Sequence, residues 1–209
     1  MLKFLVDTSP KQMSERTSEL IGGQLLTPLT GYRNFGGEFG MDNGAFSGFQ
    51  KKKWISMLSR NEEHYDRCLF VAAPDVVGSH IRTIELFEHF KGCEETRYWR
   101  DKLCLVAQDG IESSRVDWSQ FNSVFIGGST DFKDSWRAHD FTKAALALGK
   151  HVHVGRVNGF KRWETYNDIG AHTCDGSGIA MYSHMLETLE KKIGLVDEEE
   201  GPKQVDMFN

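Results

Sequence analysis

This sequence lacks the marks of several common protein classes. No apolar run approaches the roughly 18 residues that a membrane-spanning helix requires. The apolar start of the chain meets Asp7 before it reaches the length of a signal peptide. The four cysteines are scattered, and neither a CxxC nor a CxC motif occurs, which argues against a zinc knuckle or a disulfide framework. We therefore expect a cytoplasmic protein with reduced thiols, no bound metal and no membrane partner.

The sequence also lacks an excess of positive charge. Its 25 Lys and Arg residues stand against 30 Asp and Glu residues, a net charge of −5, which exerts no overall attraction on nucleic acid. Residues 195–209 carry five acidic side chains against one lysine, a net charge of −4. This segment is expected to be a solvated, disordered acidic tail. Residues 1–194, by length and apolar content, are expected to form a single domain.

Apolar strands and amphipathic helices alternate along this domain. The predicted strands cover residues 3–7, 38–42, 68–73, 102–107, 123–126, 151–154 and 171–175, with a weaker candidate at 24–27. The predicted helices cover residues 11–21, 53–67, 81–90, 136–148, 160–168 and 179–193, and Gly22-Gly23 is expected to close the first of them. Such alternation predicts a parallel sheet with helices outside it.

Two α/β architectures have this pattern, a closed (β/α)8 barrel and an open doubly wound sheet. Polar or glycine-rich residues follow nearly every predicted strand. An open sheet would concentrate such residues at one switch point, whereas a barrel uses the carboxyl ends of strands all round its rim. We therefore predict a small TIM-type barrel, trimmed relative to the usual length of about 250 residues, with its catalytic residues at the C-terminal strand ends.

Two aspartates at strand ends are candidates for covalent catalysis. Asp42 and Asp175 each end a strand, and small residues that leave room for a ligand follow both. One carboxylate that attacks and one that handles protons are the minimum for displacement at the anomeric carbon of a sugar. A lone aspartate after a strand is more often a helix N-cap, so it is the coincidence of several on one rim that favours a catalytic role.

Residues at neighbouring strand ends could read a nucleobase. Asp75 can accept hydrogen bonds from the N1–H and the exocyclic amine of guanine, and Gln108 can donate to O6. Gly127 and Gly128 would let the backbone approach the base closely. Phe46 is a candidate for stacking, although packing in the core is an equally good interpretation.

Two other kinds of function remain open from the residues alone. His151 and His153 alternate as in a strand and would point to the same face, which makes a metal-dependent barrel hydrolase an alternative, although no HExxH or similar context surrounds them. A catalytically silent barrel that binds nucleic acid is another.

Five segments in order resemble the tRNA-guanine transglycosylase superfamily. They are Asp42-Asn43-Gly44-Ala45-Phe46, Pro74-Asp75-Val76-Val77-Gly78, Gln108-Asp109-Gly110, Ile126-Gly127-Gly128 and Asp175. The resemblance covers about residues 36–182, and the wording of the first segment looks more like the branch of 7-deazaguanine DNA-guanine transglycosylases, which includes phage enzymes. It implies a pentosyltransferase without a cofactor that exchanges guanine in DNA for a 7-deazaguanine base, such as 7-cyano-7-deazaguanine.

The resemblance also implies a role for each matching residue. Asp175 would be the nucleophile that forms an aspartyl-glycosyl intermediate, and Asp42 would be the general acid and base. Asp75, Gln108 and the backbone at Gly128 would bind the base.

The features in which this sequence differs from the superfamily indicate which nucleic acid is the substrate. The tRNA enzymes carry a CxCxxC…H zinc site after the nucleophile, and this chain has no cysteine after Asp175, which favours DNA over tRNA. Exchange on tRNA or on a free nucleoside remains the alternative within the same chemistry. A target nucleotide in duplex DNA must be flipped out of the stack, and Arg156, Lys161 and Arg162 are candidates to hold its phosphates. A phage-encoded enzyme would act in the host cytoplasm.

Overall fold

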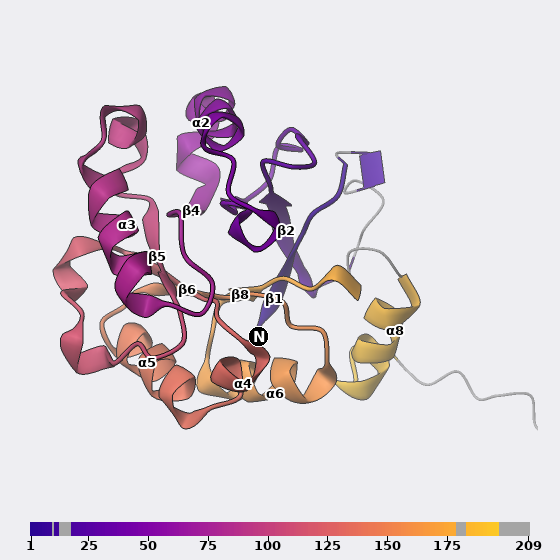
Figure 1. The fold of residues 1–209 in the computed structure, drawn as a ribbon. Coiled ribbons are helices and arrows are strands. Elements are labelled where there is room, and N and C mark those ends of the chain that lie inside the picture. The colour runs from indigo at the N-terminus through magenta and orange to yellow at the C-terminus, as the bar shows by residue number, and fades with distance from the viewer. Residues whose placement is uncertain (10, 13–17, 179–182, 197–209) are drawn as a thin grey trace, which may run out of the picture.

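The computed structural model describes residues 1–9, 11–12, 18–178 and 183–196, and the strands form a closed parallel barrel (Figure 1). Each strand pairs with the next one along the chain, and the last pairs with the first. The strands are β1 (Lys3–Val6), β2 (Ile21–Leu26), β3 (Phe39–Met41), β4 (Cys68–Ala72), β5 (Leu103–Ala107), β6 (Ser123–Ile126), β7 (His151–Val154) and β8 (Thr173–Cys174). The predicted (β/α)8 barrel is confirmed.

The helices surround the strands (Figure 1). They are α2 (Lys51–Arg60), α3 (His80–Gly92), α4 (Thr130–Lys133), α5 (Trp136–Ala147), α6 (Phe160–Ile169) and α8 (Ser183–Lys192), with the 3-10 helices η1 (Ala45–Ser47), η2 (Glu62–Arg67), η3 (Glu94–Trp99), η4 (Ser113–Arg115) and η5 (Trp118–Gln120). Within the described residues, none of these helices combines the length and the apolar character that a bilayer crossing demands.

Some predicted helices differ from those in the structure. The helix predicted over residues 53–67 is divided at Asn61, whose side-chain amide donates a 2.8 Å hydrogen bond to the Met57 carbonyl while its backbone N–H bonds to Leu58. These contacts end α2, and η2 follows. The start of the predicted helix at 179–193 and the predicted tail from residue 197 onward lie outside the described residues.

The predicted helix over residues 11–21 is wrong at its end. Ile21 begins β2, and Gly22-Gly23 lies inside this strand rather than closing a helix. A Cβ atom on Gly23 would lie 2.3 Å from the Glu38 carbonyl oxygen, so only glycine allows the backbones to come this close. This contact depends on a segment 15 residues away in the sequence, which local propensity does not reveal.

Gly23→Ala is expected to destabilise the barrel by about 1–3 kcal/mol, because the added methyl group must push the β2 backbone away from Glu38. Urea unfolding measures the change. Gly92→Ala is the control, since a Cβ at Gly92 would meet no atom within 4 Å. Equal unfolding free energies for the two variants would contradict this packing.

Side chains alternate between two apolar regions along each strand. One set faces the helices, as Phe4 and Val6 do in β1, and a smaller set fills the barrel interior. The interior cluster contains Leu5, Leu25, Phe70 and Cys104, with Leu69 and Phe125 packed against it. Because successive residues alternate, His153 of β7 shares this inner face, and its ring centroid lies 4.7 Å from that of Phe70 and 4.6 Å from that of Phe125. The apolar interior thus carries a histidine directly beneath the rim.

Candidate active site

The carboxyl ends of six strands meet in one pocket, a cavity of about 90 Å³. Eight of the ten residues predicted for the site line it: Asp42, Phe46, Asp75, Gln108, Gly127, Gly128, Arg156 and Asp175. They follow β3, β4, β5, β6, β7 and β8, so residues up to 133 positions apart face a common space. The barrel brings them together because parallel strands all end at the same rim.

The two remaining predicted residues do not line this pocket. Lys161 is exposed in the first turn of α6. Arg162 holds Asp134 through two hydrogen bonds of 2.7 Å each, from Nε and from Nη2. A phosphate would have to compete with this carboxylate for the Arg162 guanidinium. Phosphate binding by Lys161 stays a prediction.

Asp42 has an unusual protonation equilibrium. Its pKa is raised from 3.8 to about 7, first by burial and then by the negative charges of Asp175 and Asp75, although the backbone N–H of Asn43 opposes the shift. That N–H donates a 2.8 Å hydrogen bond to Oδ1 of Asp42. A carboxyl group that is half protonated near neutral pH can both donate and accept a proton, as a general acid and base must.

Asp75 lies between two buried amide side chains. Nδ2 of Asn43 donates to Oδ1 of Asp75 at 2.7 Å, and Nε2 of Gln108 donates to Oδ2. Oε1 of Gln108 accepts a 2.9 Å hydrogen bond from the Gly78 N–H. Burial raises the pKa of Asp75, and the two amides oppose this by stabilising the carboxylate. Asn43 was not predicted as a site residue, since its role depends on the spacing between β3 and β4.

The Gly127-Gly128 turn forms one wall of the pocket. Gly128 has φ +74, and a Cβ there would lie 2.6 Å from Phe132 and 2.7 Å from Asp109. Its carbonyl accepts a 2.8 Å hydrogen bond from Nζ of Lys133, a side chain that is only 3% exposed. Burial lowers the pKa of Lys133, and the positive charges of Arg162 and Arg156 lower it further. Sequence reasoning missed Lys133, because a lysine in a helix is usually solvated.

The side chain of Asp175 contacts a buried histidine, His153. Nε2 of His153 lies 3.1 Å from Oδ1 of Asp175; the aspartate side chain is 18% exposed, whereas that of His153 is fully buried. Both His153 and His151 contact the Thr173 hydroxyl rather than a metal ligand set. Within the described residues, no three His, Cys, Asp or Glu side chains are grouped so that they could hold a metal. The only sequence signal for the His153–Asp175 contact is strand alternation in β7 and β8.

Arg156 and Phe46 meet at the mouth of the pocket. The guanidinium carbon lies 3.8 Å from the centroid of the phenylalanine ring, a cation–π contact. Phe46 is 66% exposed. Among the described residues, Arg156 is the only non-glycine residue with positive φ, at 58°. The chain therefore accepts a backbone cost of about 1–2 kcal/mol to hold an arginine here.

Arg156→Gly is expected to raise the unfolding free energy by up to about 1 kcal/mol, because glycine adopts this conformation without strain. With DNA as the partner that the sequence predicts, the same variant is expected to bind single-stranded DNA more weakly, with a shallower dependence on salt. Urea unfolding and fluorescence anisotropy measure the two effects. Arg156→Asn, which tolerates positive φ, separates backbone strain from charge. A less stable glycine variant would contradict the strain.

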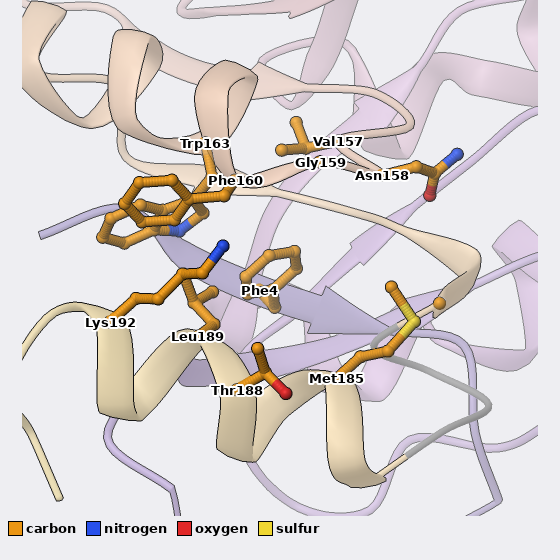
Figure 2. Close-up of a pocket in the computed structure, with 11 residues that line it drawn as sticks. Phe4, Val157, Asn158, Gly159, Phe160, Trp163, Met185, Thr188, Leu189 and Lys192 are labelled. Atoms are coloured by element: carbon orange, nitrogen blue, oxygen red, sulfur yellow. The ribbon is translucent and has the colours of Figure 1, made fainter. Parts of the chain in front are cut away.

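A larger cavity of about 200 Å³ lies between α6 and α8 (Figure 2). Phe160 and Trp163 border it on one side, and Met185 and Leu189 of α8 project from the other (Figure 2). No carboxylate is among the described residues that line it. Lys192 is the one ionisable side chain among these lining residues, whereas three carboxylates line the rim pocket, so we place the candidate chemistry at the rim pocket.

No family model matches the chain, and no curated protein matches it. The chemical interpretation therefore rests on the rim pocket, which combines two aspartates, an amide-bound third carboxylate and a glycine turn.

Proposed function

We propose that this protein is a transglycosylase that exchanges guanine in DNA for a 7-deazaguanine base through a covalent intermediate on Asp175. The observation that carries the proposal is the pairing of two unlike carboxyl groups in one pocket. Asp42, with a pKa of about 7, can serve as the proton donor, and Asp175 can attack. Environments that separate the roles of two carboxyl groups are typical of enzymes acting at an anomeric carbon.

The first displacement would break the bond between the sugar and guanine. Asp175 attacks C1′ of the deoxyribose as the C1′–N9 bond breaks, and protonated Asp42 gives its proton to the departing base. In the second displacement, Asp42 takes the N9 proton of the incoming 7-deazaguanine. The nitrogen then attacks C1′ and releases Asp175. Two successive inversions retain the configuration of the sugar.

The remaining hydrogen-bonding capacity of the pocket suits a guanine-like base. A carboxylate has about four acceptor positions, so Asp75 can still accept from N1–H and the exocyclic amine while it holds Asn43 and Gln108. The second N–H of the Gln108 amide can donate to O6. Gly127 leaves space next to that amide, because a Cβ at Gly127 would lie 3.0 Å from Nε2 of Gln108.

DNA reaches such a pocket only as an extruded or single-stranded nucleotide. The exposed ring of Phe46 offers a stacking surface at the pocket mouth, and the Arg156 guanidinium beside it can contact a phosphate. These two residues support a nucleic-acid substrate more than a free nucleoside, which needs neither contact.

The experiment that tests the proposal supplies radiolabelled guanine to the protein together with either DNA or tRNA. We expect DNA to take up the label, and excess 7-cyano-7-deazaguanine to displace it. Uptake into tRNA alone would contradict DNA as the substrate and favour exchange in tRNA. Uptake into neither polymer, with folded protein, would count against base exchange altogether.

A further inference from the structure

A chain of hydrogen bonds runs inside the barrel to Asp175. Nε2 of His151 lies 3.0 Å from Oγ1 of Thr173, which lies 2.9 Å from Nδ1 of His153. Nε2 of His153 then lies 3.1 Å from Oδ1 of Asp175. His153 and Thr173 are directly opposite in the pairing of β7 with β8. Strand alternation places all four side chains on the inner face.

The chemistry of these groups determines which atom donates in each of these hydrogen bonds. An ionised carboxylate only accepts hydrogen bonds, so Nε2 of His153 carries the proton that it donates to Asp175. In a neutral ring, Nδ1 then accepts, and the Thr173 hydroxyl donates to it. That hydroxyl has one proton, so His151 must donate from its own Nε2 to the Thr173 oxygen. Burial is the main cause that lowers the pKa of His151 to about 3, which agrees with a neutral ring there.

Exposure decides which end of the His153–Asp175 pair meets the substrate. Asp175 lines the pocket, whereas the His153 side chain is fully buried against Phe70 and Phe125 and cannot touch a ligand. A histidine general base activated by aspartate would need the reverse order. His153 occupies Oδ1, and the hydrogen bonds of the described residues leave Oδ2 of Asp175 without a donor.

We infer that His153 is a positioning residue, kept in its Nε2–H form by Asp175 and held in place by Thr173, that fixes Asp175 so that Oδ2 is the attacking oxygen. This inference rests on the proposed function of Asp175. As Oδ2 bonds to C1′ and the C1′–N9 bond breaks, Oδ1 becomes the carbonyl oxygen of the ester. It still accepts the His153 N–H, which helps Asp175 to leave in the second displacement.

The test removes the Thr173 hydroxyl. In Thr173→Val, Nδ1 of His153 loses its hydrogen-bond donor and Asp175 alone holds the ring. We therefore expect formation of the covalent intermediate to slow about 10- to 100-fold with little change in KM for DNA. Thr173→Ser restores the hydroxyl and is expected to rescue the rate. Nitrogen-15 NMR of the histidine rings in the free protein is expected to show a neutral Nε2–H ring for His153. In Thr173→Val the Nδ1 signal of His153 is expected to shift, because that nitrogen loses its hydrogen bond from Thr173.

A second pair of variants separates donation from packing. The amide of His153→Gln can still donate a hydrogen bond to Asp175, whereas His153→Leu cannot, so we expect the glutamine variant to be at least tenfold faster when both are folded. Equal rates for these two variants, or an Nδ1–H ring in the free protein, would overturn the inference. The NMR measurement needs no substrate. The hydrogen-bond chain can therefore stand when base exchange fails on both polymers, and that outcome would overturn the proposed function and the role assigned to Oδ2.

Discussion

Asp175→Asn is expected to abolish both guanine exchange and the covalent protein–DNA adduct, with a loss of at least about 10³-fold in rate. Asparagine preserves the shape of the side chain and can still contact His153, but its amide cannot form the glycosyl ester. The adduct is measured by rapid denaturation with a labelled oligonucleotide and gel electrophoresis. Exchange is measured with labelled guanine.

Asp168→Asn is the matched control for this prediction. Asp168 is an exposed aspartate in α6 and does not line the rim pocket, so the same chemical change there is expected to alter neither exchange nor adduct. An adduct that persists in Asp175→Asn would show that another residue attacks the sugar. The other carboxylates that line the rim pocket, Asp42 and Asp75, would then be the candidates.

Asp42→Asn is expected to slow formation of the covalent intermediate about 10²- to 10⁴-fold, because the departing guanine loses its proton donor. In the proposed mechanism, this first step needs the protonated carboxyl group of Asp42. Its rate is therefore expected to fall about tenfold per pH unit above pH 7, where Asp42 ionises. Single-turnover measurements between pH 5 and pH 9 test both expectations. A flat profile for the wild-type protein would contradict the assignment of Asp42.

The same substitution is expected to change the dependence of stability on pH. Because burial and the charges of Asp175 and Asp75 raise the pKa of Asp42 to about 7, the folded protein binds a proton more tightly than the unfolded chain does. The contribution of protonated Asp42 to the free energy of unfolding is therefore fully present below about pH 4 and is lost as the pH rises through about 7. Asp42→Asn removes this loss, so at pH 8 the variant should be more stable, by at most about 4 kcal/mol. Urea unfolding at pH 4 and pH 8 measures the difference.

Local patterns in the sequence were enough to predict the barrel and the rim at which the candidate site residues gather. Buried parallel strands appear as apolar runs such as residues 68–73 and 102–107, and the polar residues that follow them mark the rim. Eight of the ten predicted site residues share the pocket because topology alone carries every strand end to one rim. Arg162 was predicted for the site but does not line the pocket, since it binds Asp134 on a neighbouring connection.

Only the tertiary structure decided the properties that depend on distances between strands. Gly22 and Gly23 resemble a helix end in the sequence, but they lie in β2, where the Glu38 carbonyl approaches Gly23. The buried amides beside Asp75 and the raised pKa of Asp42 arise from groups that the closed barrel brings near one another. Sequence by itself determined which carboxylates stand at strand ends. The register of β7 against β8 decided that His153 supports Asp175, because hydrogen bonds depend on ångström distances that no linear pattern encodes.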